Sequence, residues 1–266
     1  MTSAPKDEQT LLARIAELEQ SVIDSAAQLK ETASELEAFG AALSHDLRAP
    51  LRAIDGFCQL LLEPPYIEQL DPTGRDYLQR IHRAGKKLAQ MMEDLLQLVR
   101  LGRSGVSAER VDLSRLAREI LDGFQAAEPG RRAQTAVESG IVVVGDARLL
   151  RLALENLLGN AWKFTSKKDV ADISVGRATD EGAAAIRVRD NGDGFDSQYA
   201  DRLFRPFQRL HSESEFEGVG IGLAKVRRVM RVHGGRVWAR ALRGAGASFY
   251  FSLPVIDAPQ APSTDR

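Results

Sequence analysis

The sequence Ser44-His45-Asp46-Leu47-Arg48-Ala49-Pro50 follows directly on a long stretch that has the hydrophobic rhythm of a coiled coil. Between residues 11 and 43, apolar residues alternate spacings of four and three, as the a and d positions of heptads do. The series is Leu11, Ile15, Leu18, Val22, Ser25, Leu29, Thr32, Leu36, Phe39 and Leu43, in which only Ser25 and Thr32 are polar. The pattern predicts an N-terminal coiled coil.

His45 falls outside this apolar seam, because it takes a c position when Leu43 takes an a position. Its imidazole titrates near neutral pH, so a neutral ring nitrogen is available as a nucleophile. Asp46 can orient the other ring nitrogen or accept its proton. Pro50 lacks an N–H and is expected to bend the helix one turn later. His45 is therefore a candidate surface nucleophile, and an exposed helical histidine without a role is the alternative.

Composition restricts the class of protein. The chain has 266 residues and a net charge of −1, which argues against a general nucleic-acid binder. Its single cysteine, Cys58, excludes an intrachain disulfide and favours a small core residue. The longest apolar runs, such as residues 141–144, are too short to span a bilayer, and no signal peptide is visible. The sequence predicts a cytoplasmic protein without membrane insertion.

The first part of the chain is predicted to be a helical hairpin. The helix that carries His45 should end at Glu63-Pro64-Pro65-Tyr66, and a second helix should run from the cap Asp71-Pro72 to about Leu101. Two helices alone cannot bury their apolar stripes, so two hairpins are expected to form a dimeric four-helix bundle.

After a glycine-containing hinge at residues 102–105 the pattern becomes mixed α/β. Helices are predicted at residues 112–124, at 148–162 and from about 222, with strands at 141–144, 186–189, 236–238 and 248–251. This alternation indicates a sheet with helices on one face. The predicted domains are residues 1–34 (tail and coil), 35–105 (hairpin), 106–256 (α/β domain) and 257–266 (a disordered tail).

A candidate binding face lies on the helix around residues 154–163. Asn156 and Asn160 are four residues apart and share one helix face, with Lys163 close to it. Two carboxamides and an ammonium aimed into one cleft suit a triphosphate with Mg²⁺, which prefers oxygen ligands. The alternative is a lysine near the helix C-terminus with two surface asparagines.

Three further segments carry glycines or a polar loop. In Asp190-Asn191-Gly192-Asp193-Gly194-Phe195, the glycines permit a tight loop against a planar ligand and Asp190 can accept from an exocyclic amine, although a simple turn is the alternative. Phe204-Arg205-Pro206-Phe207 precedes a polar stretch, residues 211–215, with the composition of a mobile lid. Gly218-Val219-Gly220-Ile221-Gly222-Leu223 opens a helix whose backbone N–H groups can bind phosphate. The P-loop sequence is absent.

Taken in order, these five segments resemble the five signature boxes of bacterial two-component sensor histidine kinases, and the resemblance covers roughly residues 35–254. Residues 43–57 resemble the branch linked to phytochromes and PAS domains. The resemblance implies a coiled coil leading into a dimeric four-helix bundle. A GHKL-type (Bergerat) ATP-binding domain would follow, with helices on one face of a mixed sheet.

The resemblance also implies roles for residues. His45 would be the phosphoacceptor, Asp46 its acid/base neighbour, and Asn160 the Mg²⁺ ligand. The implied ATP-binding residues are Asn156, Asn160, Lys163, Asp190, Gly192, Gly194, Phe195, Arg205, Gly218, Gly220, Gly222 and Leu223. The implied cofactors are ATP and Mg²⁺. The implied partners are a second copy of the chain, a response regulator receiver domain, and a sensor domain or sensor protein outside this chain.

Two positions refine the expected chemistry. Asn156 stands where related ATPases of this fold carry a water-activating glutamate, which disfavours direct hydrolysis. Ala49 stands where relatives with strong phosphatase activity carry Thr or Asn, which predicts a kinase-dominant protein. The alternatives are an ATPase or serine/threonine kinase of the same nucleotide-binding fold, and a non-catalytic dimeric scaffold. The stimulus, the regulator, and phosphorylation in cis or in trans stay open, as does whether the chain is a piece of a longer protein.

Overall fold

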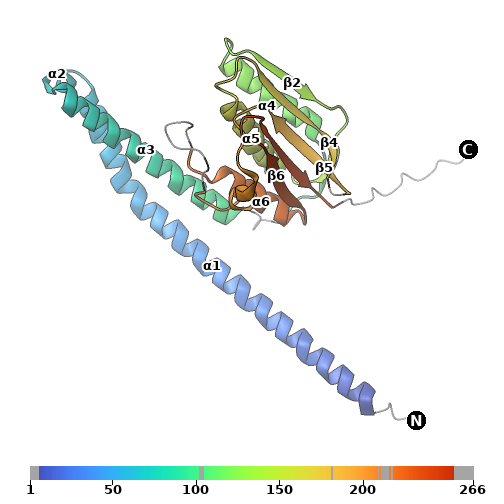
Figure 1. Ribbon diagram of the computed structural model, residues 1–266. Helices are drawn as coiled ribbons and strands as arrows, with labels where there is room; N and C mark the ends of the chain where they lie inside the picture. Colours follow the sequence, from blue (N-terminus) through green and yellow to red (C-terminus); the bar gives the residue numbers. More distant parts are fainter. Residues whose placement is uncertain are drawn as a thin grey trace, which may run out of the picture. The chain divides into compact units, whose positions relative to one another are not determined.

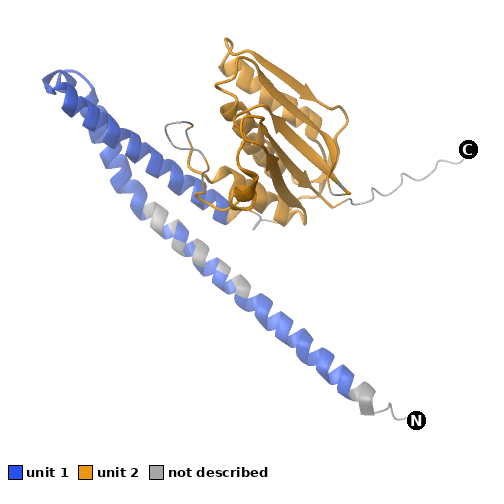
Figure 2. Cartoon of the chain, in the orientation of Figure 1, with its two compact units in different colours: residues 1–99 blue, residues 100–266 orange. Residues whose placement is uncertain are grey.

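The computed structural model describes residues 6–101, 105–180, 182–208, 210, 216 and 218–254, without the side chains of residues 6–9, 29, 30, 33, 36, 37, 39, 41, 43–45 and 183. The hinge residues 102–104, the polar stretch 211–215 and the tail 257–266 lie outside the described residues. The chain divides into two compact units, residues 1–99 and 100–266 (Figure 2).

The first unit is a long helix followed by a shorter antiparallel one. It consists of α1 (Lys6–Leu62), α2 (Tyr66–Gln69) and α3 (Pro72–Arg100) (Figure 1). Pro50 lies inside α1 without ending it, and the bend expected there stays a prediction. The helix ends before the two prolines, as predicted. Oδ1 of Asp71 accepts a hydrogen bond from N of Gly74 at 2.6 Å, which confirms the predicted cap of the second helix.

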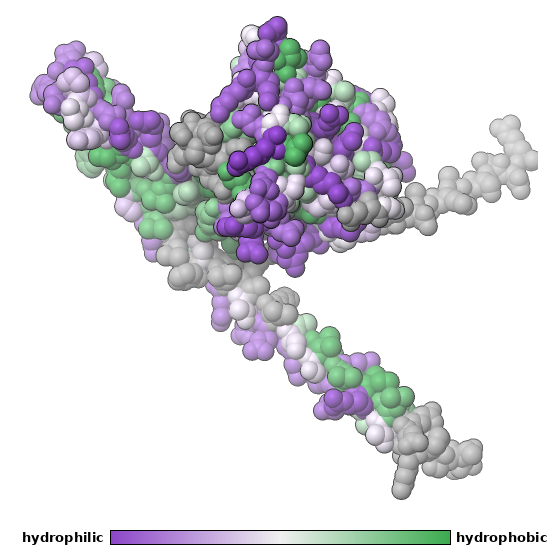
Figure 3. All heavy atoms as spheres, viewed as in Figure 1, coloured by the Kyte–Doolittle hydropathy of each residue, from purple (hydrophilic) through white to green (hydrophobic). Residues whose placement is uncertain are grey.

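A narrow seam is buried between the helices, and a wide apolar face is not. Cys58 is buried, as predicted, and so are Leu51, Leu78 and Leu96. Phe57 is 67% exposed. The other exposed apolar side chains of the hairpin include Ile54, Leu60, Leu61, Ile81, Leu88 and Leu95, and those of the N-terminal part of α1 include Leu11, Ile15, Leu18 and Val22. Figure 3 shows such side chains gathered along both parts. A face of this kind favours association with another helical surface.

One polar pair joins α1 to α3 within the hairpin. Nε2 of His82 lies 2.9 Å from Oδ1 of Asp55, and neither buried atom has a hydrogen-bond partner among the described residues. The contact has the distance of an ion pair but not the geometry of a hydrogen bond. The pair links the two helices at this level.

The second unit alternates helices and strands. Its elements are β1 (Glu109–Asp112), α4 (Leu113–Ala127), β2 (Ala133–Val137), β3 (Val142–Gly145), α5 (Ala147–Phe164), β4 (Ala171–Asp180), β5 (Ala183–Asp190), the 3₁₀ helix η1 (Ser197–Arg202), α6 (Gly222–Val232), β6 (Arg236–Ala241) and β7 (Ala247–Ser252). Strands β1 and β3 form an antiparallel pair, and the main sheet has the order β2-β4-β5-β7-β6. Only the β2–β4 pairing of the main sheet is parallel.

Helices α4, α5 and α6 cover one face of the main sheet (Figure 1). The prediction of a mixed sheet with helices on one face is therefore confirmed. Strands β1, β2 and β4 were not predicted from the sequence. Strand β2 is short and largely exposed at the sheet edge, whereas β4 does alternate buried with less buried residues, through Ala171, Ile173 and Val175. That period of two is the signal that was missed.

Helix α5 is central to the unit because it presents two different faces. Leu154, Leu157 and Leu158 are almost completely buried on its sheet side. The helix begins at Asp146, whose Oδ1 accepts from N of Leu149 at 3.0 Å. The backbone N of Asp146 donates to Nε2 of His233 at 3.0 Å, which ties the start of α5 to the end of α6. Among the described residues, no helix is both long and apolar enough to cross a membrane.

Candidate functional site

The most unusual group in the second unit is the carboxylate of Asp190, at the end of β5. The residue is 3% exposed. Its Oδ1 accepts hydrogen bonds from the backbone N of Gly192 at 2.8 Å and of Ala247 at 3.3 Å. Burial raises the pKa of Asp190 to about 6, against the lowering effect of these two hydrogen bonds. Oδ2 accepts from no described residue in the hydrogen bonds of the structure, so it is the oxygen left for a ligand.

The loop after Asp190 is packed too tightly for larger residues. A Cβ on Gly192 would lie 2.8 Å from the carbonyl oxygen of Phe164, at the end of α5. Gly194 has a φ of +60°, and a Cβ there would overlap the carbonyl oxygen of Leu242. The glycines thus let the loop lie against α5 on one side and the β6–β7 turn on the other.

The glycine run before α6 lies along the outer face of α5. A Cβ on Gly222 would be 2.6 Å from Oδ1 of Asn156, and one on Gly218 would be 3.2 Å from Nζ of Lys163. Nδ2 of Asn156 donates to the carbonyl oxygen of Leu152 at 2.7 Å. The structure therefore brings Asn156 and Lys163 beside the predicted phosphate-binding glycines Gly222 and Gly218. Asn160 lies between them on the same helix and is half-buried.

An aromatic and basic cluster beside this face was not predicted. Phe216 is buried, and its ring packs edge-on against Phe164 with centroids 4.9 Å apart. Nζ of Lys167 lies 4.3 Å from the centre of the Phe216 ring, and Nζ of Lys168 lies 3.7 Å from Oδ1 of Asp193. Phe216 is a single phenylalanine in an otherwise polar stretch, and this was the feature of the sequence that could have indicated the cluster. The cluster places cations next to the loop that follows Asp190.

Other predicted residues have different surroundings. Phe195 is buried, with its ring centroid 6.1 Å from that of Phe249, so its described contact belongs to the core. The backbone N of Phe207 donates to the carbonyl oxygen of Gly220 at 2.9 Å, which links the segment after η1 to the glycine run. Leu223 is half-buried in the first turn of α6. Arg205 lines a cavity that contains none of the other predicted nucleotide-site residues.

His45 and Asp46 lie in the first unit, within α1. The side chain of His45 is outside the described residues, whereas that of Asp46 is exposed. Ala49 follows one helical turn after His45 and is also exposed. The roles predicted for these residues stay predictions.

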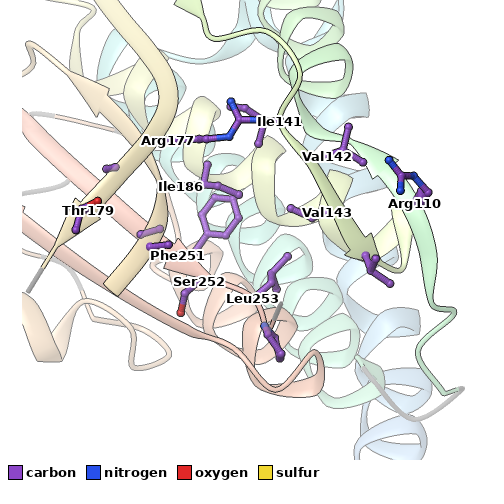
Figure 4. A pocket seen from close by; sticks show the side chains of 15 residues that line it. Arg110, Ile141, Val142, Val143, Arg177, Thr179, Ile186, Phe251, Ser252 and Leu253 are labelled. Atoms are coloured by element: carbon purple, nitrogen blue, oxygen red, sulfur yellow. The ribbon is translucent and has the colours of Figure 1, made fainter. Parts of the chain in front are cut away.

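A cavity of about 640 Å³ opens between the β1–β3 pair and the main sheet. Figure 4 shows Ile186 and Phe251 from the main sheet facing it, with Val142 and Val143 from β3. Arg177 also lines it, but its guanidinium is held by Glu138 at 2.5 Å. None of the predicted site residues lines this cavity. Within the described part of the chain, no three His, Cys, Asp or Glu side chains gather into a metal-binding group.

The buried carboxylate, the glycine loop and the polar face of α5 define an ATP-binding domain of the kind suggested by the sequence. The model for the histidine kinase-, DNA gyrase B- and HSP90-like ATPase matches residues 145–257. The model for the His Kinase A (phospho-acceptor) domain matches residues 35–104. The chain therefore belongs to the two-component sensor histidine kinases, with both domains in the order typical of that family.

Curated proteins and a solved structure are similar to the chain over most of its length. Cyanobacterial phytochrome A of Nostoc sp. is 32% identical over 229 residues, which cover 85% of this chain and 29% of that protein. The methanogenesis regulatory histidine kinase FilI of Methanothrix harundinacea is 34% identical over 222 residues, covering 83% and 25%. The crystal structure of full-length ShkA in complex with AMPPNP matches with a TM-score of 0.57 and 30% identity, covering 81% of this chain and 45% of that one. The chain thus spans less than a third of the length of these two curated relatives.

Proposed function

We propose that the protein is an ATP-dependent histidine kinase that phosphorylates itself on His45 and passes the phosphoryl group to an aspartate of a response regulator. The observation that carries the proposal is the buried carboxylate of Asp190, which lies at a strand end beside a glycine loop packed against α5. The two domains of the family, matched in sequence order, support the same function.

The residues of the second unit fit an adenine nucleotide. Oδ2 of Asp190 is available to accept from the adenine amino group, because Oδ1 is already engaged by Gly192 and Ala247. The glycine run leaves room for phosphates beside Asn156 and Lys163, since any side chain at Gly222 would meet the amide of Asn156. Phe195, Leu223 and Arg205 remain in the proposed binding set, although Arg205 lines a separate cavity in the structure.

Mg²⁺ is proposed to enter with ATP rather than as a resident ion. An amide oxygen of Asn160 would complete a shell made largely of phosphate and water oxygens, which is how Mg²⁺ is commonly held. The ion would neutralise charge on the transferred phosphoryl group.

In the proposed reaction, a neutral ring nitrogen of His45 forms a bond to the γ-phosphorus of ATP while the bond to the bridging oxygen breaks and ADP leaves. Asp46 orients the ring or accepts the proton on its other nitrogen. An aspartate of a receiver domain then attacks the phosphohistidine, which restores His45. Asn156 cannot accept a proton from water, and this disfavours hydrolysis of ATP over transfer.

Labelling with radioactive ATP and Mg²⁺ tests the proposal. The label is expected to be acid-labile and base-stable, as a phosphohistidine is. His45→Gln should abolish labelling while leaving binding of an ATP analogue intact, and Asn160→Ala should abolish labelling through loss of Mg²⁺. An acid-stable label would favour a serine/threonine kinase, and failure to bind the analogue would favour a non-catalytic scaffold.

The protein is further proposed to have weak phosphatase activity toward its regulator, because Ala49 has no polar group to orient water one turn after His45. Dephosphorylation of the phosphorylated regulator should be slow with the wild type and faster with Ala49→Thr. Rapid dephosphorylation by the wild type would contradict this reasoning.

The exposed apolar face of the hairpin supports a homodimer with residues 35–105 as its bundle. Residues 1–34 are proposed to form a coil that receives a signal from a sensor outside this chain. The catalytic domain is proposed to span residues 106–256. Sedimentation of the full chain should give a dimer, and Phe57→Lys should shift it toward the monomer because Phe57 is among the most exposed residues of that face.

A further inference from the structure

A second cavity in the second unit lies between η1, α6 and the edge strand β6. It has a volume of about 440 Å³, within the range of small-molecule sites. Its walls carry the arginines Arg205, Arg227, Arg231 and Arg236 and one carboxylate, that of Asp201. Phe204, Val237 and Ala239 supply apolar lining.

Local backbone structure brings these arginines together. Arg227 and Arg231 are four residues apart on α6 and therefore share one face of the helix. The turn after α6 is tight, because N of Gly234 donates to the carbonyl oxygen of Arg231 at 3.0 Å and N of Gly235 donates to that of Met230 at 2.8 Å. The chain thereby returns at once, and Arg236 at the start of β6 lines the same cavity as Arg231.

Arg236 is held in place by a fixed aromatic ring. Its guanidinium carbon lies 4.7 Å from the centre of the Trp238 ring. Trp238 stacks on Tyr250 with centroids 5.6 Å apart, and its Nε1 donates to Oδ2 of Asp180 at 2.6 Å. Because the ring is anchored on two sides, the guanidinium above it is oriented before any ligand arrives.

The positive charge of the cavity is not neutralised within the described part of the chain. Four arginines against one aspartate give a net charge of +3 in the lining, although the whole chain has a net charge of −1. None of the four arginines forms a salt bridge with a carboxylate of a described residue. All four arginines are exposed and keep their charge at any ordinary pH, so the cavity presents a permanent positive charge to anions in solution.

We propose that this cavity binds a small anion that carries two or more phosphate groups. Two phosphates carry about three to four negative charges at neutral pH, which matches the charge of the lining. The planar forks of arginine donate paired hydrogen bonds to phosphate oxygens, and a concave site of one sign concentrates such ions. Of the residues assigned to the nucleotide, only Arg205 lines this cavity, and the other three arginines have no role in the proposed kinase reaction.

Calorimetric titration of the full chain with inorganic pyrophosphate at constant ionic strength tests the proposal. The test variant is Arg227→Gln with Arg231→Gln. The matched control is Arg110→Gln with Arg243→Gln, which removes the same charge from two exposed arginines that do not line the cavity. Binding of an ATP analogue is measured on every variant as a check of folding.

The wild type and the control are expected to bind pyrophosphate alike, and the test variant about tenfold or more weakly while retaining analogue binding. Equal binding by the test variant and the control would overturn the proposal, as would absence of binding to the wild type. Loss of hexaglutamate binding in the test variant, without any binding of pyrophosphate to the wild type, would also overturn it and assign the site to an acidic protein partner.

Discussion

Replacing Asp190 by asparagine is expected to stabilise the second unit and to weaken its binding of nucleotide. Burial raises the pKa of Asp190 from 3.8 to about 6. The folded protein therefore binds this proton more tightly than the unfolded chain does. Its free energy of unfolding must fall as pH rises from about 4 to about 6 and level off above that range. The difference between the two pKa values corresponds to about 3 kcal/mol.

An amide at this position carries no charge to desolvate, and its oxygen can still accept from the N–H groups of Gly192 and Ala247. Asp190→Asn should therefore be more stable than the wild type by up to about 3 kcal/mol at pH 7.5, with the difference vanishing below pH 4. Its NH₂ would face the adenine amino group as a second donor, so affinity for ATP should drop even though stability rises.

Urea unfolding followed by tryptophan fluorescence measures this effect, because both tryptophans, Trp162 and Trp238, lie in the second unit. Comparing the variant with the wild type at each pH cancels the titration of every other carboxylate. A variant that is less stable than the wild type at pH 7.5, or a difference that does not change between pH 4 and pH 7.5, would refute the argument.

Three further changes test other parts of the structure. Placing a non-glycine residue in the left-handed region costs about 1–2 kcal/mol. In urea unfolding, Gly194→Ala should destabilise the second unit by well over that amount, because its Cβ would overlap the carbonyl oxygen of Leu242. The control Gly182→Ala has open space around its Cβ and should show only the smaller loss. His82→Ala removes the partner of Asp55 and should lower the thermal midpoint of the hairpin, measured by circular dichroism. Adding Asp55→Leu should restore part of this loss. No loss in the single variant would exclude a structural role of the pair. Hydrogen bonds from Arg177 lower the pKa of Glu138, so the stability that this carboxylate contributes should be present above its ordinary pKa of 4.5 and lost as pH falls below it. In urea unfolding at a series of pH values, Glu138→Gln should remove this loss of stability at acid pH. An unchanged pH profile in the variant would contradict the prediction.

Sequence patterns predicted most of the fold because most elements carry their own periodicity and caps. Asp112 and Asp146 each cap a helix through a backbone N–H three residues on. Strand β2 could not be predicted this way, since its short and largely exposed sequence has no buried period of two, and its place depends on pairing with β4. The arginine cavity was equally hidden, because it joins residues from three segments that only the folded chain brings together.

The candidate site shows the same division between local and tertiary information. The period of an α-helix determines that Asn156, Asn160 and Lys163 share a face while Leu154, Leu157 and Leu158 share the buried one. No periodicity says what lies against the polar face. That information resides in Gly218 and Gly222, whose missing side chains let a second backbone approach Lys163 and Asn156. A side chain at Gly222 would displace the amide of Asn156 before any ligand bound. The glycines are therefore as much a part of the proposed phosphate site as the polar residues they face.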